Sequence, residues 1–240
     1  QQPLISIHIP KCAGTSFSNI LQSWFGAGFC RHYFNEKKNE LPIRQKLYSG
    51  FFIKKHKSGL CIHGHFNNDR GMGVLEYYPE SNQMITIIRN PWEVHLSNYF
   101  YVKRNLQDGK AYRDGRKLEA SEMGSLEDYL KENDKSYICQ FFPSNITLQN
   151  YTDILEEKFL FMGVAENLQD SVTLLADKLG FPAMEVPKLN ESERNETIPG
   201  GALERFMGNN ALEMAIYDYI KDTFEKQLTE FNLHQKVRAE

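Results

Sequence analysis

The chain has few cysteines, no excess of basic residues and no long apolar run. It contains 4 Cys in 240 residues, which is too few for a disulfide framework and predicts free thiols. A formal net charge of −3 excludes a protein that binds nucleic acid through a general excess of positive charge. No segment approaches the roughly 20 apolar residues of a membrane-spanning helix, and the first residues lack a signal-peptide pattern. We therefore expect a cytoplasmic protein, with the Golgi lumen as the alternative if an N-terminal anchor has been removed.

Length and composition predict one α/β domain over residues 1–240. Hydrophobic residues make up 41% of the chain and charged residues 25%, as in an ordinary globular protein. A chain of 27.9 kDa is large enough to bury a substantial core.

The first motif joins an expected strand to an expected helix. Residues 4–8 read as a strand, and the helix has an apolar stripe at helical spacing: Phe17, Ile20, Leu21 and Trp24. Between them lies IPKCAGTS, residues 9–16, with Thr15 and Ser16 expected at the N-cap. A loop of small residues between a strand and a helix presents backbone N–H groups to an anion.

This loop differs from the Walker A loop of nucleoside triphosphatases. In Walker A the Lys follows the glycines, whereas Lys11 precedes Gly14 here. The best candidate for a buried strand, residues 84–88, ends in Arg89 and not in the Asp that holds Mg²⁺. We expect the site to bind its anion with cationic side chains and backbone amides.

The second motif is RNPWEVHLS, residues 89–97. Asn90 is suited to an N-cap, Pro91 to the first helical position and Glu93 to the third. A strand thus delivers Arg89 to the start of a helix, and Ser97 lies about two turns into it.

Together the two motifs resemble those of the sulfotransferase superfamily that uses 3′-phosphoadenosine-5′-phosphosulfate (PAPS). The resemblance implies a central, mainly parallel sheet flanked by helices, in a fold like that of the P-loop-containing nucleoside triphosphate hydrolases. It also implies that the first loop holds the 5′-phosphosulfate and that the Arg and Ser of the second motif hold the 3′-phosphate. The implied donor contacts are Lys11, Cys12, Ala13, Gly14, Thr15, Ser16, Arg89 and Ser97. Cys12 stands where the family more often has Thr or Ser, so only backbone contacts carry over at that position.

A histidine pair lies between the two motifs, in CIHGHF, residues 61–66. The apolar start reads as a short strand, so His63 and His65 are expected to emerge at its end on one side. Structural histidines and a metal site with Cys61 are the alternatives, but no nearby Cys or His completes a four-ligand set, and we expect no metal. The pattern is similar to that of heparan sulfate 2-O-sulfotransferases. That likeness implies that His65 is the catalytic base and His63 its partner.

Four further features carry expectations. Residues 188–192 resemble the loop that closes over the donor in carbohydrate-type sulfotransferases, which implies Lys188 and Ser192 as donor contacts. Arg70 is a candidate acceptor contact. The basic stretch 103–124 reads as a surface loop, either simply solvated or a lid over an anionic acceptor. Cys12, at a helix N-terminus, is expected to have a lowered thiol pKa.

The leading interpretation is therefore a PAPS-dependent sulfotransferase that acts on a hydroxyl of a carbohydrate or glycolipid, whether anionic or neutral. Two alternatives stay open: a phosphoryl-transfer enzyme such as a kinase, and a non-catalytic module that binds anionic glycans. We expect no nucleic-acid partner and no membrane span in this chain, and the sequence leaves the oligomeric state open.

Overall fold

The computed structural model describes residues 3–45, 59–113, 115–132, 137–187 and 196–239. Within them, no helix combines the length and the apolar character needed to cross a membrane. Five strands form one sheet: β1 (Leu4–Ile7), β2 (Phe29–His32), β3 (Cys61–Gly64), β4 (Met84–Ile88) and β7 (Phe159–Val164).

The five strands of this sheet are all parallel, in the order β2-β3-β1-β4-β7. β1 and β4 are mainly apolar in sequence, with Ser6 and Thr86 as their polar residues, and both are buried along their whole length, as parallel strands covered on both faces must be. The expected α/β architecture, a central parallel sheet flanked by helices, is confirmed.

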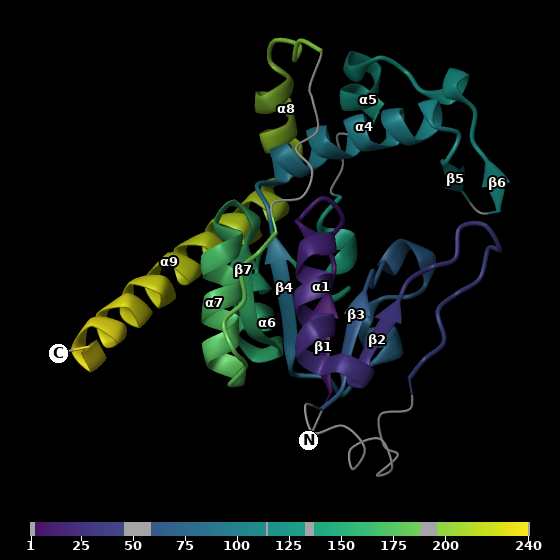
Figure 1. Ribbon diagram of the computed structural model, residues 1–240. Coiled ribbons are helices and arrows are strands. Elements are labelled where there is room, and N and C mark those ends of the chain that lie inside the picture. The colour runs from purple at the N-terminus through teal and green to yellow at the C-terminus, as the bar shows by residue number, and fades with distance from the viewer. Residues whose placement is uncertain (1–2, 46–58, 114, 133–136, 188–195, 240) are drawn as a thin grey trace.

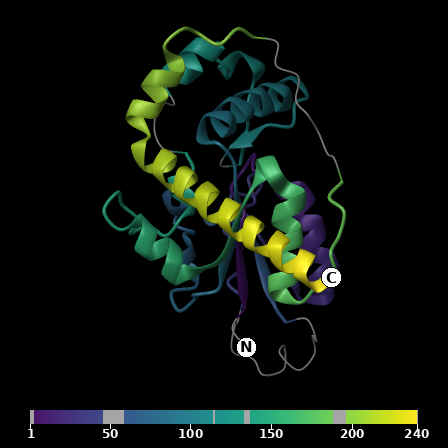
Figure 2. The same cartoon turned by 90° about the vertical axis from the view of Figure 1, so that its left-hand side faces the viewer.

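Helices cover both faces of the sheet (Figures 1 and 2). α1 and α7 lie on one face and α6 on the other, while α9 crosses the edge formed by β7 (Figure 2). The bounds of these helices are α1 (Gly14–Phe25), α6 (Tyr151–Lys158), α7 (Leu168–Leu179) and α9 (Ala211–Ala239). The apolar stripe expected for α1 faces this core, as do apolar residues of α7 and α9. The core includes Phe17, Leu21, Val172, Ile216 and Phe224.

A second group of helices lies above the carboxyl ends of the strands (Figure 1). It consists of α4 (Pro91–Gln107), α5 (Leu126–Glu132) and α8 (Ala202–Asn209). These helices share a small apolar cluster of their own, made of Trp92, Leu96, Tyr99, Leu126, Leu130, Ala202 and Phe206. The part of the chain that the structure describes also contains the short helix α3 (Val74–Tyr77) and a hairpin of β5 (Tyr112–Arg113) and β6 (Arg116–Lys117).

One strand was missed from the sequence and one segment was assigned wrongly. No strand was expected at residues 29–32, but Phe29–His32 forms the edge strand β2. Its four residues are too few to show a strand pattern, and pairing with β3 holds it in place. The segment 103–124 was expected to be a loop, but α4 continues to Gln107 and the hairpin follows.

Burial of histidine makes the fold sensitive to acid. Burial lowers the pKa of His32 to about 4 and those of His8, His63 and His65 to about 3. The unfolded chain takes up protons below pH about 6.5, the ordinary histidine pKa, whereas the folded chain does not. Stability is therefore complete above that pH and falls as the pH drops toward 4.

We predict that His32→Phe weakens this acid sensitivity. Both His32 ring nitrogens lack a hydrogen-bond partner among the described residues, and its ring stacks on Phe66 at 4.6 Å, a contact that Phe can keep. In urea unfolding between pH 6.5 and 5, the free energy of unfolding should lose about 1.4 kcal/mol less per pH unit than in the wild type. His234→Phe, on an exposed part of α9, should leave the slope unchanged. An equal slope in the His32 variant would contradict the assignment.

Candidate functional site

The strand order brings the three predicted loops to one place. β1 lies between β3 and β4, and all three run in the same direction. Ile7 pairs with Gly64 on one side and with Thr86 on the other. The loops that follow the three strands therefore leave the same edge of the sheet, where ligands of open α/β sheets bind.

The loop after β1 has the conformation of an anion-binding turn. Lys11 and Ala13 both have left-handed backbone conformations, with φ of 68° and 57°. Ala13 is the N-cap of α1 and no side chain caps the helix, so the first-turn amides, at Gly14, Thr15 and Ser16, have no partner within the helix. Thr15 and Ser16 lie inside the first turn, so the predicted N-cap was two to three residues too late. These amides and the helix dipole favour a negative charge.

Cys12 lies in this loop with its side chain buried in the main core. Burial raises the pKa of the Cys12 thiol far above its ordinary value, so the expected lowered pKa was wrong. Because the side chain is part of the core, only the backbone of Cys12 is left for a ligand.

The start of α4 follows the sequence prediction. Asn90 is the N-cap, its side chain accepts from the amide of Glu93 at 3.2 Å, and Pro91 occupies the first turn. The backbone N–H of Asn90 donates to Glu166 Oε1 at 2.8 Å. Arg89 lies at the end of β4 with its guanidinium 3.3 Å from Glu93 Oε2, and Ser97 is buried two turns into the helix.

Three cations converge on the first loop. Lys11 Nζ lies 4.0 Å from the ring centroid of Tyr101, one turn after Ser97 on α4. Burial, and then the positive charges of Arg104 and Arg89, lower the pKa of Lys11 to about 8. Cations that repel one another in this way bind an anion strongly, because the bound anion offsets their mutual repulsion.

Sequence reasoning missed Arg104. It lies seven residues, or two turns, after Ser97, which places both on the same face of α4. That spacing was visible in the sequence, but residues from 103 onward had been assigned to a loop.

An imidazole cluster adjoins the cations on the β3 side. His63 lies within β3 instead of beyond its end, is 0% exposed, and its Nδ1 lies 2.8 Å from Ser6 Oγ. His65 follows β3 and is only partly buried, but its Nε2 is shut off from solvent without a hydrogen-bond partner among the described residues. Gly64 separates the two because a Cβ there would lie 1.7 Å from the carbonyl oxygen of His32.

His8 is the third imidazole of this cluster and was not a sequence candidate. Its ring stacks on His63 with centroids 5.2 Å apart and lies 4.5 Å from the ring of His65. Burial first, and then the neighbouring His63 and Lys11, lower its pKa to about 3. The three rings are therefore neutral at physiological pH and able to accept or donate a hydrogen bond.

The remaining candidates are placed less directly. Arg70 pairs with Glu36 at 2.9 Å and lies over the Phe34 ring at 4.4 Å; its positive charge also contributes to the lowered pKa of His65. Lys188 and Ser192 lie outside the described residues. The described residues include no group of three or more His, Cys, Asp or Glu arranged to hold a metal ion.

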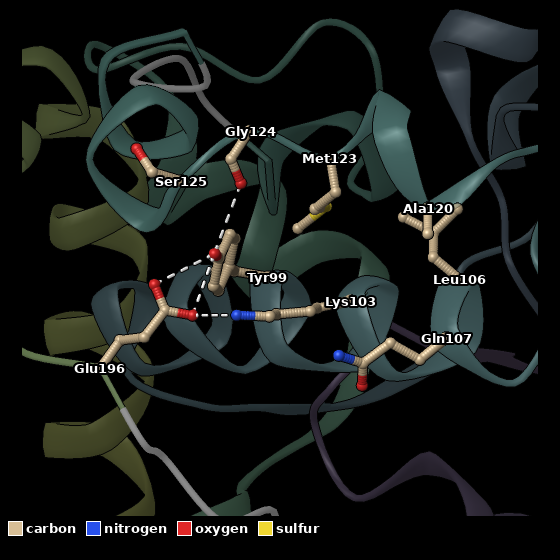
Figure 3. Close-up of a pocket in the computed structure, with 9 residues that line it drawn as sticks. All are labelled: Tyr99, Lys103, Leu106, Gln107, Ala120, Met123, Gly124, Ser125 and Glu196. Atoms are coloured by element: carbon tan, nitrogen blue, oxygen red, sulfur yellow. Dashed lines mark hydrogen bonds and ion pairs between the residues drawn. The ribbon is translucent and has the colours of Figure 1, made fainter.

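A separate cavity is lined by residues of α4 that include Tyr99 and Leu106 (Figure 3). Helical spacing places these two residues on the opposite face of α4 from Ser97 and Arg104. The cavity encloses about 380 Å³, and Lys103 and Tyr99 on its wall both point to the Glu196 carboxylate. Its lining consists of Tyr99, Lys103, Leu106, Gln107, Ala120, Met123, Gly124, Ser125 and Glu196. None of the predicted site residues lines it. Lys103, expected in a basic lid, is instead paired with Glu196.

Comparison with known proteins gives limited information. No protein-family model matches the chain, and a search of curated proteins gives no match. Among solved structures, the chain is similar to the one titled "Crystal structure of mouse sulfotransferase SULT7A1 complexed with PAP", with 14% identity and a TM-score of 0.37. The match covers 77% of this chain and 61% of the mouse chain. A similarity of this size does not assign the chain to a family.

The lowered pKa of Lys11 predicts that anion binding weakens at alkaline pH. With a pKa of about 8, the free protein loses the Lys11 charge above that pH, and a bound anion raises the pKa again. Affinity for inorganic sulfate should therefore fall by up to about tenfold per pH unit between pH 8 and 10, measured by calorimetry. Lys11→Arg, whose guanidinium stays charged, should bind with little pH dependence. An equal decline in that variant would assign the effect to another group.

Proposed function

We propose that this chain is a sulfotransferase that transfers the sulfuryl group of PAPS to a hydroxyl group, with residues 1–240 as a single sulfotransferase domain. The observation that carries the proposal is the convergence of cations, free helix amides and neutral imidazoles at the ends of three adjacent strands. Cations and amides suit a donor with several anionic groups. Neutral imidazoles beside them suit removal of a proton from a weakly acidic hydroxyl.

In this proposal the two loops hold the donor. The 5′-phosphate would lie against the amides of Gly14, Thr15 and Ser16, with Lys11 beside the bridging oxygen. The 3′-phosphate would lie between Arg89 and Ser97, with Arg104 adding positive charge on the same helix face. Cys12 and Ala13 would contribute backbone, and Lys188 and Ser192 belong to the proposal on sequence resemblance alone.

The reaction is an in-line displacement at sulfur. The acceptor oxygen forms a bond to sulfur while the bond from sulfur to the 5′-phosphate oxygen breaks, and the acceptor proton passes to His65. Lys11 compensates the charge that grows on the departing oxygen, as an oxyanion hole does. His63, held by Ser6, packs beside His8 and next to the proposed base, His65. The products are the sulfated acceptor and adenosine 3′,5′-bisphosphate (PAP).

The proposed acceptor is a carbohydrate or glycolipid hydroxyl. It would approach from the side of His65 and Arg70, since the opposite side of β1 is occupied by the nucleotide motif. Arg70 is tied to Glu36, so it would contact an acceptor together with that carboxylate. A screen of glycans, glycolipids and small alcohols with ³⁵S-labelled PAPS tests the acceptor class directly.

Donor binding tests the proposal first. PAP should raise the melting temperature, because a ligand at 100 times its Kd adds about 2.7 kcal/mol of stability, and ATP with Mg²⁺ should have a much smaller effect. Arg89→Ala should weaken PAP binding by about tenfold or more, since it removes a charge-assisted contact. Lys221→Ala, which removes an exposed cation of α9, is the matched control. Stabilisation by ATP with Mg²⁺ but not by PAP would favour a kinase. Binding of a glycan in the absence of any PAP binding would favour a non-catalytic module.

His65→Ala should lower kcat by about 10²–10⁴, the usual contribution of a general base, with PAP affinity close to that of the wild type. The measurement is initial-rate transfer from ³⁵S-labelled PAPS. His234→Ala removes an exposed imidazole of α9 and should not change kcat. Turnover near the wild-type rate in the His65 variant would remove this residue from the role of base.

A further inference from the structure

His8 occupies the space between the anion-binding loop and the histidine pair. Its backbone N–H donates to the carbonyl of Gly64 at 2.8 Å, which fixes the end of β1 to the end of β3. A Cβ added to Gly14 would lie 1.6 Å from His8 Nε2 and 2.2 Å from the adjacent ring carbon Cδ2. The bare Cα of Gly14 therefore rests against the Nε2 end of the imidazole. The ring of His65 also lies close to that of His8, with centroids 4.5 Å apart.

The partner of Nδ1 sets the tautomer of His8. Nδ1 lies 2.8 Å from the hydroxyl of Tyr33, and burial raises the pKa of that phenol well above its usual value. A phenol is a stronger hydrogen-bond donor than a neutral imidazole N–H, so Tyr33 donates and Nδ1 accepts. In a neutral ring with an accepting Nδ1, the hydrogen is on Nε2.

The Nε2–H group of His8 has no hydrogen-bond partner among the described residues, and the side chain is only half-buried. It lies at the first residue of α1, where the free amides begin. A donor held by those amides and attacked from the side of His65 would have its sulfur between the two, next to the His8 imidazole.

We propose, on the basis of the proposed function, that His8 is a catalytic residue that donates a hydrogen bond from Nε2 to a sulfuryl oxygen of the donor. It acts as a neutral donor, and Tyr33 is the residue that fixes its tautomer. No proton is transferred at His8: the acceptor proton goes to His65, and the negative charge leaves with the 5′-phosphate. Two neutral imidazoles side by side thus have opposite roles, one as acceptor and one as donor.

Substitutions at His8 distinguish a hydrogen-bond donor from a base. His8→Gln carries an amide N–H near the position of Nε2 but cannot take up a proton at neutral pH. His8→Leu has neither property. The donor role predicts that His8→Leu lowers kcat by about 10²–10³, as removal of one oxyanion-hole donor does, and that His8→Gln recovers to within about tenfold of the wild type.

Ligand affinities give a second readout that does not need an acceptor. PAPS carries the sulfuryl group and PAP does not, so His8→Leu should weaken PAPS binding by about tenfold and leave PAP binding nearly unchanged. His8→Gln should keep the wild-type ratio of the two affinities. Tyr33→Phe, which leaves Nδ1 without its partner, should lower kcat by a smaller factor of about 3–10. Calorimetry with both nucleotides, with melting temperatures as a check on folding, measures these effects.

The outcomes separate the two proposals. If the wild type binds neither PAPS nor PAP, the proposed function fails. If the wild type binds both and His8→Leu keeps the wild-type affinity ratio and kcat, the role of His8 is overturned. If His8→Gln is as inactive as His8→Leu in a folded protein, the imidazole acts as a base and the donor role is equally overturned.

Discussion

The site depends on the hydrogen bonding of β1 to β3 on one side and to β4 on the other. β1 has only four residues, and all four are buried. Because both neighbours are parallel to it, a histidine loop, a phosphate-type loop and an arginine emerge within a few ångströms along one edge. A change of direction in either neighbour would move its loop to the far end of the sheet, and no local interaction could restore the site.

Burial gives the two halves of this site different electrostatics. On the β4 side, three cations stand close enough that Arg104 and Arg89 lower the pKa of Lys11, so the site is unfavourable without an anion. On the β3 side, burial keeps three imidazoles uncharged, so they do not add to that repulsion. An anionic donor thus has a strong preference for one half, and a hydroxyl acceptor finds neutral hydrogen-bonding groups in the other.

α4 links the site to the rest of the upper helices. Ser97, Tyr101 and Arg104 lie on the face toward the first loop, and Tyr99 and Lys103 lie on the face toward the cavity closed by Glu196. Its residues Trp92, Leu96 and Tyr99 pack with α5 and α8, while Val94 belongs to the main core around the sheet. The position of the donor-side cations is therefore set by packing among the upper helices as well as by β4.

The sequence by itself determined the features that depend on short-range patterns. The buried strand at residues 84–88, the Asn90 cap with Pro91 after it and the stripe of α1 were predicted because period, capping and turn residues act over a few positions. The sequence also pointed to Lys11, Arg89 and His65 through motifs. It did not indicate β2, which is too short to show a pattern, or the extension of α4 beyond residue 103, where polar side chains conceal an apolar face.

Only the tertiary structure decided which distant groups meet and what their charges are. Strand order brings His8 to the site, and its position on one face of α4 brings Arg104 there. No spacing in the sequence indicated that His8 packs on Gly14. Cys12 shows the same point in reverse: its position at a helix start suggested an acidic thiol, yet its burial gives the opposite pKa shift. Desolvation depends on everything packed around a group, and that packing is a property of the whole fold and not of the neighbouring sequence.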